Sequence, residues 1–306
     1  GVALAHSYSE RHMVASAPID TTLDDLRDHG VVDEHEGAVW LRSTDYGDDK
    51  DRVLVKTDGQ FTYLLPDIAY HRDKFERGYE RLINVWGADH HGYVARMKAA
   101  MAALGHAPDE LDCELTQLVR LMRDGEEVKL SKRTGDMIEL RDIVDEVGPD
   151  ATRFTYLLQS VDTPQSIDLA VVVSQSMENP VFYVQMAHAR LCSGASVAAE
   201  RGIERRPPQD VDLSVLTEPR ELDVLKALYT LPSAVELAAR ELAPHKISNW
   251  VRELASAVHR FYHDCPILRD DVDDDLQQAR LLLAEAARVG ISVGLRLLGV
   301  TAPESM

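Results

Sequence analysis

The hydrophobic pattern of this chain changes its period partway along, and that change constrains the fold more than any other feature. Over roughly the first 160 residues, short apolar runs alternate with helical patterns, which favours an α/β arrangement. From about residue 169 onward, apolar residues recur at three- and four-residue spacing, as in helices that pack into a bundle. We therefore predict an α/β domain over residues 1–172, followed by an all-α helical-bundle domain over residues 173–306.

Local signals indicate approximate bounds for the elements of both halves. The first half contains strand-like runs at 39–41, 53–55, 82–86 and 114–121. Helical patterns in the same half cover 20–30, 67–78, 91–104 and 140–146. The run at 82–86, LINVW, is almost wholly apolar, which is typical of a strand buried in a parallel sheet. In the second half we expect an exposed linker at 202–212 and helices at 180–200, 218–239, 245–264 and 275–298.

Composition restricts the partners that the chain can have. The net charge of -19 argues against a general nucleic-acid coat, because diffuse affinity for phosphate needs a positive field, but it leaves room for a local basic groove. No stretch approaches the roughly 20 apolar residues that cross a bilayer. The 3 cysteines are far apart, unlike a disulfide framework. We expect a monomeric cytoplasmic protein without a membrane partner.

The polar loop after residue 121 carries the first chemical signal. The string KLSKRTG at 129–135 puts two lysines, a hydroxyl and a glycine into one loop. Lysines of this kind are mobile point charges for the oxygens of a polyphosphate. Taken alone, the same string also fits a solvated basic turn.

A second signal, the string WGADHH at 86–91, stands where the apolar strand is predicted to meet a helix. In open parallel sheets, ligands bind outside the carboxyl ends of the strands. Gly87 would let a ligand approach the backbone, and the carboxylate of Asp89 can accept hydrogen bonds from ribose hydroxyls. The alternative is a structural glycine turn with a capping aspartate.

The third signal lies in the string TYLLPDIAYH at 62–71. Tyr63 and Asp67 are four residues apart, so their side chains project together if the backbone turns helically there. A phenol and a carboxylate that face one pocket suit a cationic guanidinium, which a carboxylate binds bidentately. The alternative is a surface tyrosine beside an N-cap aspartate.

Read in order, five segments resemble arginyl-tRNA synthetases, a family of class I aminoacyl-tRNA synthetases. They are TYxxxDIAYH, WGADHHGYVARMKAA, RDGEEVKLSKRTG, ENPVFYVQMAHAR and the closing LLGVTAPExM. KLSKR alone would indicate only class I, whereas the tyrosine–aspartate segment and the tail are the specific parts. The resemblance runs from about Asp20 to Met306. It implies an incomplete Rossmann-like class I catalytic domain and then the family's helical anticodon-binding domain, named DALR.

Matching positions imply roles in ATP binding. Lys132 and Lys129 match the lysines of the KMSKS loop, which stabilises the ATP phosphates as pyrophosphate leaves, and Ser131 is the accompanying hydroxyl. Gly87 and Asp89 match the residues that bind the ATP ribose.

The resemblance also implies an arginine site and a reaction. Tyr63 and Asp67 match the tyrosine and aspartate that select the substrate guanidinium, and His90 stands in the place of a glutamine of some relatives. The implied enzyme converts arginine and ATP, with Mg²⁺, into arginyl-adenylate and pyrophosphate, and then transfers arginine to tRNA(Arg). No covalent nucleophile is needed, so positioning and fixed positive charge would supply the catalysis.

The helical half is implied to bind the anticodon. Its candidates for RNA contact are Arg190, Arg205, Arg206, Lys246, Asn249, Arg252 and Arg260. Exposed basic residues are commonly plain surface, which is the alternative for each of them. Trp250, Phe261 and Tyr262 are candidates for stacking on bases, the alternative being core packing.

Other interpretations stay open. The chain lacks the His-x-Gly-His string of class I enzymes, so we expect it to be the C-terminal portion of a longer enzyme, inactive alone. A non-catalytic tRNA-binding module is the first alternative. The string DHH at 89–91 also resembles the manganese-binding triplet of DHH phosphoesterases, whose further aspartate motifs are not evident. His259, His263 and Cys265 lie close together in sequence, but a fourth zinc ligand is not evident, and we predict no metal site.

Overall fold

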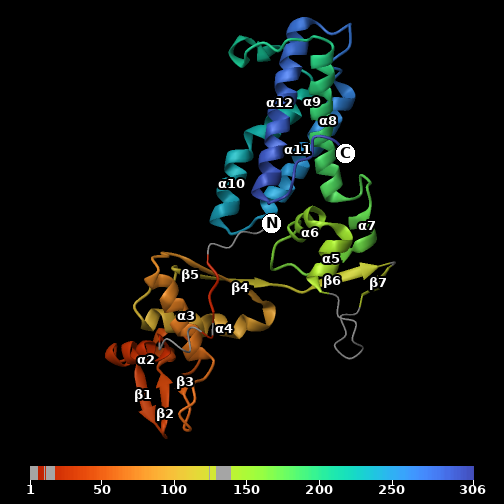
Figure 1. Ribbon diagram of the computed structural model, residues 1–306. Helices are drawn as coiled ribbons and strands as arrows, with labels where there is room; N and C mark the ends of the chain where they lie inside the picture. Colours follow the sequence, from red (N-terminus) through yellow and green to blue (C-terminus); the bar gives the residue numbers. More distant parts are fainter. Residues whose placement is uncertain (1–5, 10, 12–17, 124, 129–138) are drawn as a thin grey trace. The chain divides into compact units, whose positions relative to one another are not determined.

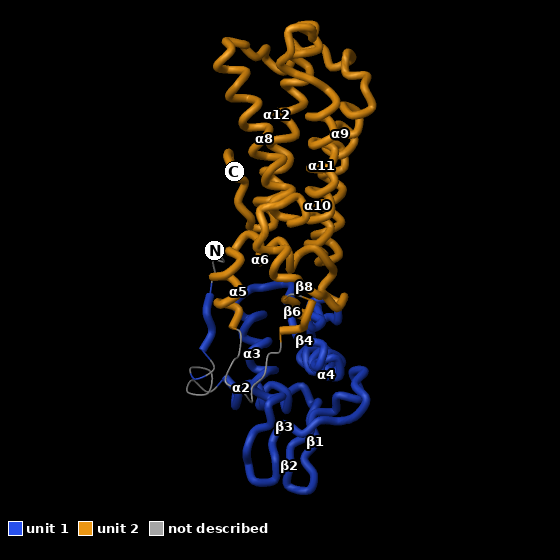
Figure 2. Tube along the Cα trace, turned by 90° about the vertical axis from the view of Figure 1, so that its right-hand side faces the viewer, with its two compact units in different colours: residues 1–118 blue, residues 119–306 orange. Residues whose placement is uncertain are grey.

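The computed structural model describes residues 6–9, 11, 18–123, 125–128 and 139–306. The chain divides into two compact units, Gly1–Leu118 and Val119–Met306, and each is described by itself (Figure 2). The compact units divide after Leu118, whereas the boundary expected at residue 172 is placed between the α/β domain and the all-α domain. The boundary at 172 stays a prediction.

An antiparallel sheet of three strands forms one part of the first unit (Figure 1). Its strands, in order, are β1 (Val32–His35), β2 (Ala38–Leu41) and β3 (Arg52–Val55). The turn between β1 and β2 places Glu36 and Gly37 at φ 54° and 76°, the paired positive values of a tight hairpin. The sequence does not predict β1, because its residues after Val32 are polar or charged and only the pairing with β2 makes it a strand.

The second sheet of this unit is parallel. β4 (Leu82–Gly87) pairs with β5 (Leu111–Thr116), and the crossover between them consists of the 3-10 turn η2 (Ala88–His90) and helix α4 (His91–Ala103). These elements share one apolar core with α2 (Pro18–Asp28) and α3 (Leu64–Glu76). The predicted succession of a parallel strand and a helix over 82–104 is confirmed.

The two faces of β4 differ in burial. Leu82 and Asn84 are buried, whereas Ile83 and Val85 are 47% and 67% exposed. The expectation of a wholly buried strand is therefore wrong for the described part of the chain. An apolar run shows that a strand can be covered on both faces, but the covering elements lie elsewhere in the sequence.

The strand expected at 114–121 is two strands in different sheets. β5 ends at Thr116, and β6 (Val119–Arg123) belongs to the second unit. There β6 pairs with β7 (Glu126–Glu127) and, in parallel, with β8 (Gln165–Asp168). No glycine or proline separates β5 from β6, so the local pattern is continuous. The break is decided by the partners of each strand.

Helices dominate the second unit (Figure 1). Two helices precede β8 and one follows it: α5 (Leu140–Val147), α6 (Pro149–Tyr156) and α7 (Leu169–Val173). The bundle consists of α8 (Pro180–Glu200), α9 (Pro219–Tyr229), α10 (Leu231–Arg240), α11 (His245–Asp264) and α12 (Asp274–Leu297). α11 packs against the other four, which confirms the predicted bundle. None of the helices in the described ranges is long and apolar enough to cross a membrane.

The helix expected at 218–239 is two helices, α9 and α10. Thr230 separates them, and Pro232 lies in the first turn of α10. Proline has no amide hydrogen and its ring clashes with the preceding turn, so it ends one helix and suits the start of the next.

Candidate active site

The start of α3 brings Tyr63 and Asp67 onto one helical face. Tyr63 has helical backbone angles, φ −61° and ψ −23°, and its carbonyl accepts the amide hydrogen of Asp67 at 3.4 Å. This is the helical turn that the four-residue spacing required. Tyr63 is 93% exposed, whereas Asp67 is half-buried. The tyrosine therefore offers its ring to solvent, while the aspartate lies against the neighbouring helix.

Asp67 is held by Tyr93 of α4, a residue that the sequence alone does not single out. The phenol oxygen Oη of Tyr93 donates to Asp67 Oδ2 at 2.6 Å. Burial raises the pKa of the Tyr93 phenol, and the hydrogen bond to Asp67 and the charge of its carboxylate raise this pKa further. Tyr93 therefore stays protonated and acts as a donor. It belongs to the WGADHHGYVARMKAA segment, but no local signal pairs it with α3.

Three side chains surround the ring of Tyr93. The Trp86 ring meets it edge-on with 5.7 Å between centroids, and the His90 ring does so at 6.3 Å. The guanidinium carbon of Arg96 lies 4.9 Å from the centroid of the Tyr93 ring, within the range of a cation–π contact. The carboxylate of Asp67 is thereby connected to the β4–α4 turn through one phenol.

The turn Gly87-Ala88-Asp89 lies at the carboxyl end of β4. A methyl group on Gly87 would lie 2.7 Å from Asp89 Oδ1, although Gly87 has ordinary extended angles. The carboxylate of Asp89 is exposed and can rotate away, so neither this contact nor a left-handed backbone requires glycine here. The Asp89 side chain is 83% exposed, and its Oδ1 lies 3.9 Å from His90 Nε2. This carboxylate is open to a ligand.

The lysine loop occupies residues 129–135. Lys129, Ser131 and Lys132 lie outside the described residues, and their roles at the ATP phosphates stay predictions. The other candidates for the catalytic site all lie in the first unit, on α3 or on the β4–α4 connection.

The first candidate for tRNA contact, Arg190, lies on α8 beside an aromatic ring. Arg190 donates to His259 Nδ1 at 3.1 Å, and its guanidinium carbon lies 5.6 Å from the ring centroid of Tyr262. His259 Nε2 donates to the carbonyl of Tyr183 at 3.0 Å, so the imidazole is neutral. Burial lowers the pKa of His259, and the positive charge of Arg190 lowers it too. Arg190 is thus held next to a ring that is 38% exposed.

The four candidates for tRNA contact on α11 lie in two different environments. Asn249 and Arg252 line an open hollow whose remaining walls are Met177, Glu178, Pro180, Tyr183, Glu253 and Ser256. Lys246 instead pairs with Glu241 at 3.1 Å, and Arg260 donates to Ser256 Oγ at 2.5 Å. Of the four candidates on α11, only Asn249 and Arg252 line the same hollow.

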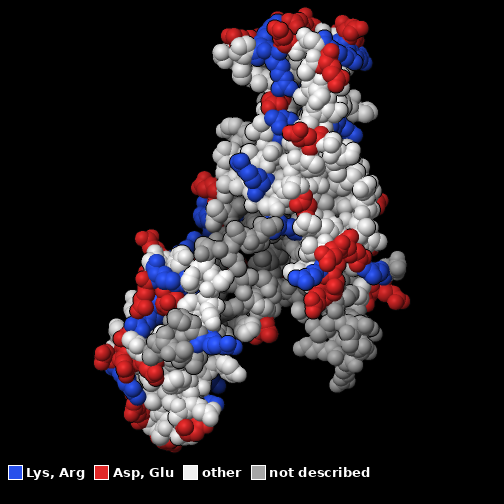
Figure 3. Space-filling view, viewed as in Figure 1, with Lys and Arg blue, Asp and Glu red and all other residues white. Residues whose placement is uncertain are grey.

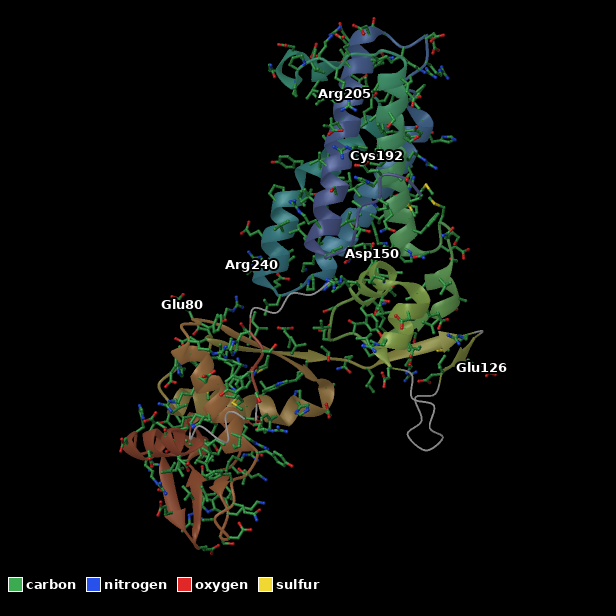
Figure 4. All side chains as sticks on the ribbon, in the orientation of Figure 1. Glu80, Glu126, Asp150, Cys192, Arg205 and Arg240 are labelled. Atoms are coloured by element: carbon green, nitrogen blue, oxygen red, sulfur yellow. The ribbon has the colours of Figure 1, made fainter. Side chains whose placement is uncertain are left out.

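Arg205, which Figure 4 labels, and Arg206 follow the end of α8 and are paired with acidic side chains of α12. Arg205 lies 3.3 Å from Glu285, and Arg206 contacts both Asp274 and Asp275. Basic and acidic side chains are intermixed on this end of the bundle (Figure 3). Contact with RNA at this end would require these arginines to exchange partners.

Two of the three aromatic candidates for base stacking are core residues. Trp250 is 4% exposed and its Nε1 donates to the carbonyl of Ala227 at 2.8 Å, and Phe261 is fully buried. Core packing is therefore the correct interpretation for both, because α11 turns both rings into the core of the bundle. For Tyr262, which is partly exposed, stacking stays a prediction.

Within the described ranges, no group of three or more His, Cys, Asp or Glu side chains is arranged to hold a metal ion. His259 uses both ring nitrogens in hydrogen bonds, and burial raises the pKa of the Cys265 thiol. The phosphoesterase alternative gains no support from this part of the chain.

Comparisons with known proteins point to one family. Residues 7–191 match the family described as tRNA synthetases class I (R), catalytic domain, and residues 184–306 match the DALR anticodon binding domain. The chain is 48% identical over 299 residues to an arginine–tRNA ligase of Bacillus licheniformis, and 50% identical over 301 residues to one of Anoxybacillus flavithermus. Each match covers 98% of this chain and 53% of the relative. The chain therefore spans about half the length of the curated relatives it matches.

Solved structures share the fold. A Campylobacter jejuni structure assigned as an arginyl-tRNA synthetase has a TM-score of 0.88 at 34% identity, over 100% of this chain and 65% of that one. The Thermus thermophilus arginyl-tRNA synthetase, at 21% identity, has a TM-score of 0.77 over 96% of this chain and 59% of that one. The predicted fold class is confirmed: an incomplete class I α/β catalytic domain followed by a DALR-type helical domain. The chain belongs to the arginyl-tRNA synthetase family of class I aminoacyl-tRNA synthetases.

Proposed function

We propose that this chain supplies part of an arginine–tRNA ligase, which activates arginine with ATP and transfers it to tRNA(Arg). Besides the family, one observation carries the proposal. Tyr93 holds the Asp67 carboxylate and packs against His90, the neighbour of Asp89 in the β4–α4 turn. This neighbourhood supports adjacent sites for the arginine side chain and the ATP ribose.

Asp67 is the proposed anchor for the substrate guanidinium. Its Oδ2 already accepts the Tyr93 hydroxyl, so Oδ1 is the oxygen that can receive a guanidinium N–H. A hydrogen bond between ions of opposite charge is about twice as strong as a neutral one. Tyr63, four residues earlier and exposed, can close over the same group, and His90 completes the arginine site.

The β4–α4 turn and the lysine loop are the proposed ATP site. Gly87 permits close approach to the backbone, and the exposed carboxylate of Asp89 suits the ribose hydroxyls. Lys132, with Lys129 and Ser131, would bind the phosphates of ATP, which enters with Mg²⁺. The arginine carboxylate attacks the α-phosphorus in line, so the lysines act where negative charge grows on the departing pyrophosphate.

The helical bundle is the proposed tRNA site. An RNA base would stack on the partly exposed ring of Tyr262, and the neighbouring guanidinium of Arg190 would neutralise the phosphate of that nucleotide. The hollow with Asn249 and Arg252 offers a second polar surface on the same bundle. Lys246 and Arg260 are weaker candidates, because each is held in a local pair. A cytoplasmic monomer stays a prediction.

Replacing Asp67 tests the arginine site. In a protein of the relatives' full length, Asp67→Asn should raise the KM for arginine in ATP–pyrophosphate exchange roughly ten- to hundredfold, because a hydrogen bond to a charged group contributes about 1.5–3 kcal/mol. The KM for ATP should change little. The matched control is Asp24→Asn, an exposed carboxylate on α2. An unchanged KM for arginine would mean that the guanidinium binds elsewhere.

A tRNA-binding module without catalysis is the second candidate for this chain alone. The lack of a His-x-Gly-His string in this sequence favours it, because the resemblance implies that class I catalysis uses those histidines. Incubating the chain with arginine, ATP and tRNA should give no charged tRNA, whereas adding the remaining half of a full-length relative should restore charging. Charging by the chain alone would reject this candidate.

A further inference from the structure

The hydrogen bond between Tyr93 and Asp67 crosses from one helix to another. Tyr93 lies on α4, 26 residues after Asp67 on α3, and its Oη lies 2.6 Å from Asp67 Oδ2. A bond of this length to a carboxylate is charge-assisted and restricts the rotation of the carboxylate plane. One oxygen of Asp67 thereby accepts a hydrogen bond from the protein, and Oδ1 is the oxygen to which the guanidinium is proposed to bind.

The phenol of Tyr93 is itself fixed on several sides. Trp86 and His90 meet its ring edge-on, and the guanidinium of Arg96 lies over it. Arg96 Nε is buried and has no hydrogen-bond partner among the residues described, and the guanidinium lies over the Tyr93 ring in a cation–π contact. The ring cannot swing away from Asp67 without losing these contacts.

The protonation state of Tyr93 suits this arrangement. Burial and the neighbouring carboxylate both raise the pKa of the phenol, so the hydroxyl keeps its proton throughout the neutral range. A phenolate would repel Asp67, whereas the neutral phenol donates to it.

We propose that Tyr93 is a positioning residue for arginine: it holds the Asp67 carboxylate in the orientation that receives the substrate guanidinium. This inference rests on the proposed role of Asp67. Tyr93 touches no reacting atom and acts through Asp67 alone. Its loss should therefore weaken arginine binding and leave the chemical step and ATP binding nearly unchanged.

A double-mutant cycle with Asp67 tests this in a protein of the relatives' full length. Tyr93→Phe keeps the ring and removes only the hydroxyl. It should raise the KM for arginine about five- to tenfold, the effect of one lost hydrogen bond, with kcat for ATP–pyrophosphate exchange nearly unchanged. In the Asp67→Asn background the same substitution should change this KM less than about twofold, because the residue through which Tyr93 acts is already altered. The control is Tyr79→Phe, an exposed tyrosine whose ring also faces an arginine side chain.

The outcomes separate this inference from the proposed function. If Asp67→Asn leaves the KM for arginine unchanged, the arginine site itself is wrong. If Asp67→Asn raises it and Tyr93→Phe does not, only the positioning role is overturned. An equal effect of Tyr93→Phe in both backgrounds would also overturn it, since Tyr93 would then act independently of Asp67.

A fluorinated tyrosine at position 93 serves if Tyr93→Phe does not fold. Fluorination preserves the ring and lowers the pH at which the phenol ionises. The KM for arginine should then rise with pH as the phenolate forms beside Asp67, while the unmodified protein shows no such rise. A KM that stays level across the titration of the fluorinated phenol would overturn the inference.

Discussion

His71 and Asn84 meet inside the first unit and join the helix that carries Asp67 to the strand that ends at Gly87. The Asn84 side-chain amide donates to His71 Nε2 at 2.8 Å, and His71 Nδ1 donates to the carbonyl of Asp67 at 2.7 Å. Asn84 Oδ1 also lies 3.1 Å from Nε2, so it is burial that favours the neutral imidazole, in which Nε2 accepts while Nδ1 donates. Burial is the main cause that lowers the pKa of His71.

The lowered pKa of His71 predicts that the folded protein loses stability in mild acid. Because the pKa of His71 is lowered from its ordinary value of 6.5, the unfolded chain binds more protons than the folded one below that pH. The contribution of His71 to the free energy of unfolding is therefore complete above about pH 6.5 and is lost as the pH falls toward the lowered pKa. Urea unfolding between pH 8 and pH 5.5 measures it.

A matched control isolates His71 from other histidines. His29 makes the same bond to a carbonyl four residues earlier, at 2.7 Å, but is exposed. His71→Asn should flatten the dependence of stability on pH, and His29→Asn should not. The lowered pKa of His259 adds to the same slope in all variants, so the difference between variants is decisive. Equal slopes would contradict the prediction.

The ion pair between Glu221 and Arg280 should be costly to break. Arg280 Nε lies 2.7 Å from Glu221, the two side chains are 7% and 0% exposed, and Arg280 Nη1 also donates to the carbonyl of Pro266. Glu221→Gln leaves a buried guanidinium without its counter-charge, so the free energy of unfolding should fall by about 3–5 kcal/mol. Glu236→Gln, which removes an exposed partner of Arg240, should change it by less than about 1 kcal/mol. Urea denaturation compares the two, and equal effects would refute the first.

Close packing of α11 and α12 requires a glycine at position 294. A methyl group there would lie 2.9 Å from Val251 Cγ2 and 3.0 Å from the ring of Trp250. Gly294→Ala should lower the free energy of unfolding by about 1–3 kcal/mol, because the core must move to admit the methyl group. Gly194→Ala is the control, since its methyl group would make an ordinary 3.6 Å contact with Tyr262 and alanine favours a helix by about 1 kcal/mol. A Gly294→Ala protein as stable as the parent would show that α12 is not packed this closely.

Lys132→Ala should slow the formation of arginyl-adenylate in a protein of full length. The loss of one preorganised charge contact costs about 10²-fold or more in rate, and the affinity for ATP should change less than the rate. Rapid-quench measurement of adenylate formation tests this, with Lys56→Ala, an exposed lysine beside β3, as the control. An unchanged rate would remove Lys132 from the proposed ATP site.

Arg252→Ala should weaken the binding of tRNA and make it less sensitive to salt. If Arg252 neutralises one phosphate, its removal should reduce the slope of log K against log salt by about 1. Filter binding over a salt series measures that slope. Arg240→Ala, which removes a side chain paired with Glu236 and Glu241, should leave it unchanged. A slope that Arg252→Ala does not alter would exclude this side chain from phosphate contact.

The sequence by itself determined the kinds of element and the family. Hydrophobic period and capping residues act over three or four positions, and this range is sufficient to predict the helix at 245–264 and the parallel strand ending at Gly87. The motif strings are local in the same sense. They identify Tyr63, Asp67 and Asp89 without any knowledge of their neighbours in space.

Tertiary structure alone decided which residues meet. The pairing of Tyr93 with Asp67 spans 26 positions and that of Arg280 with Glu221 spans 59, and no pattern within either segment encodes them. The same holds for β1, which is a strand only because β2 lies beside it, and for Trp250, which the bundle buries. Contacts of this kind depend on packing summed over the whole fold, where many weak interactions between distant segments select one arrangement.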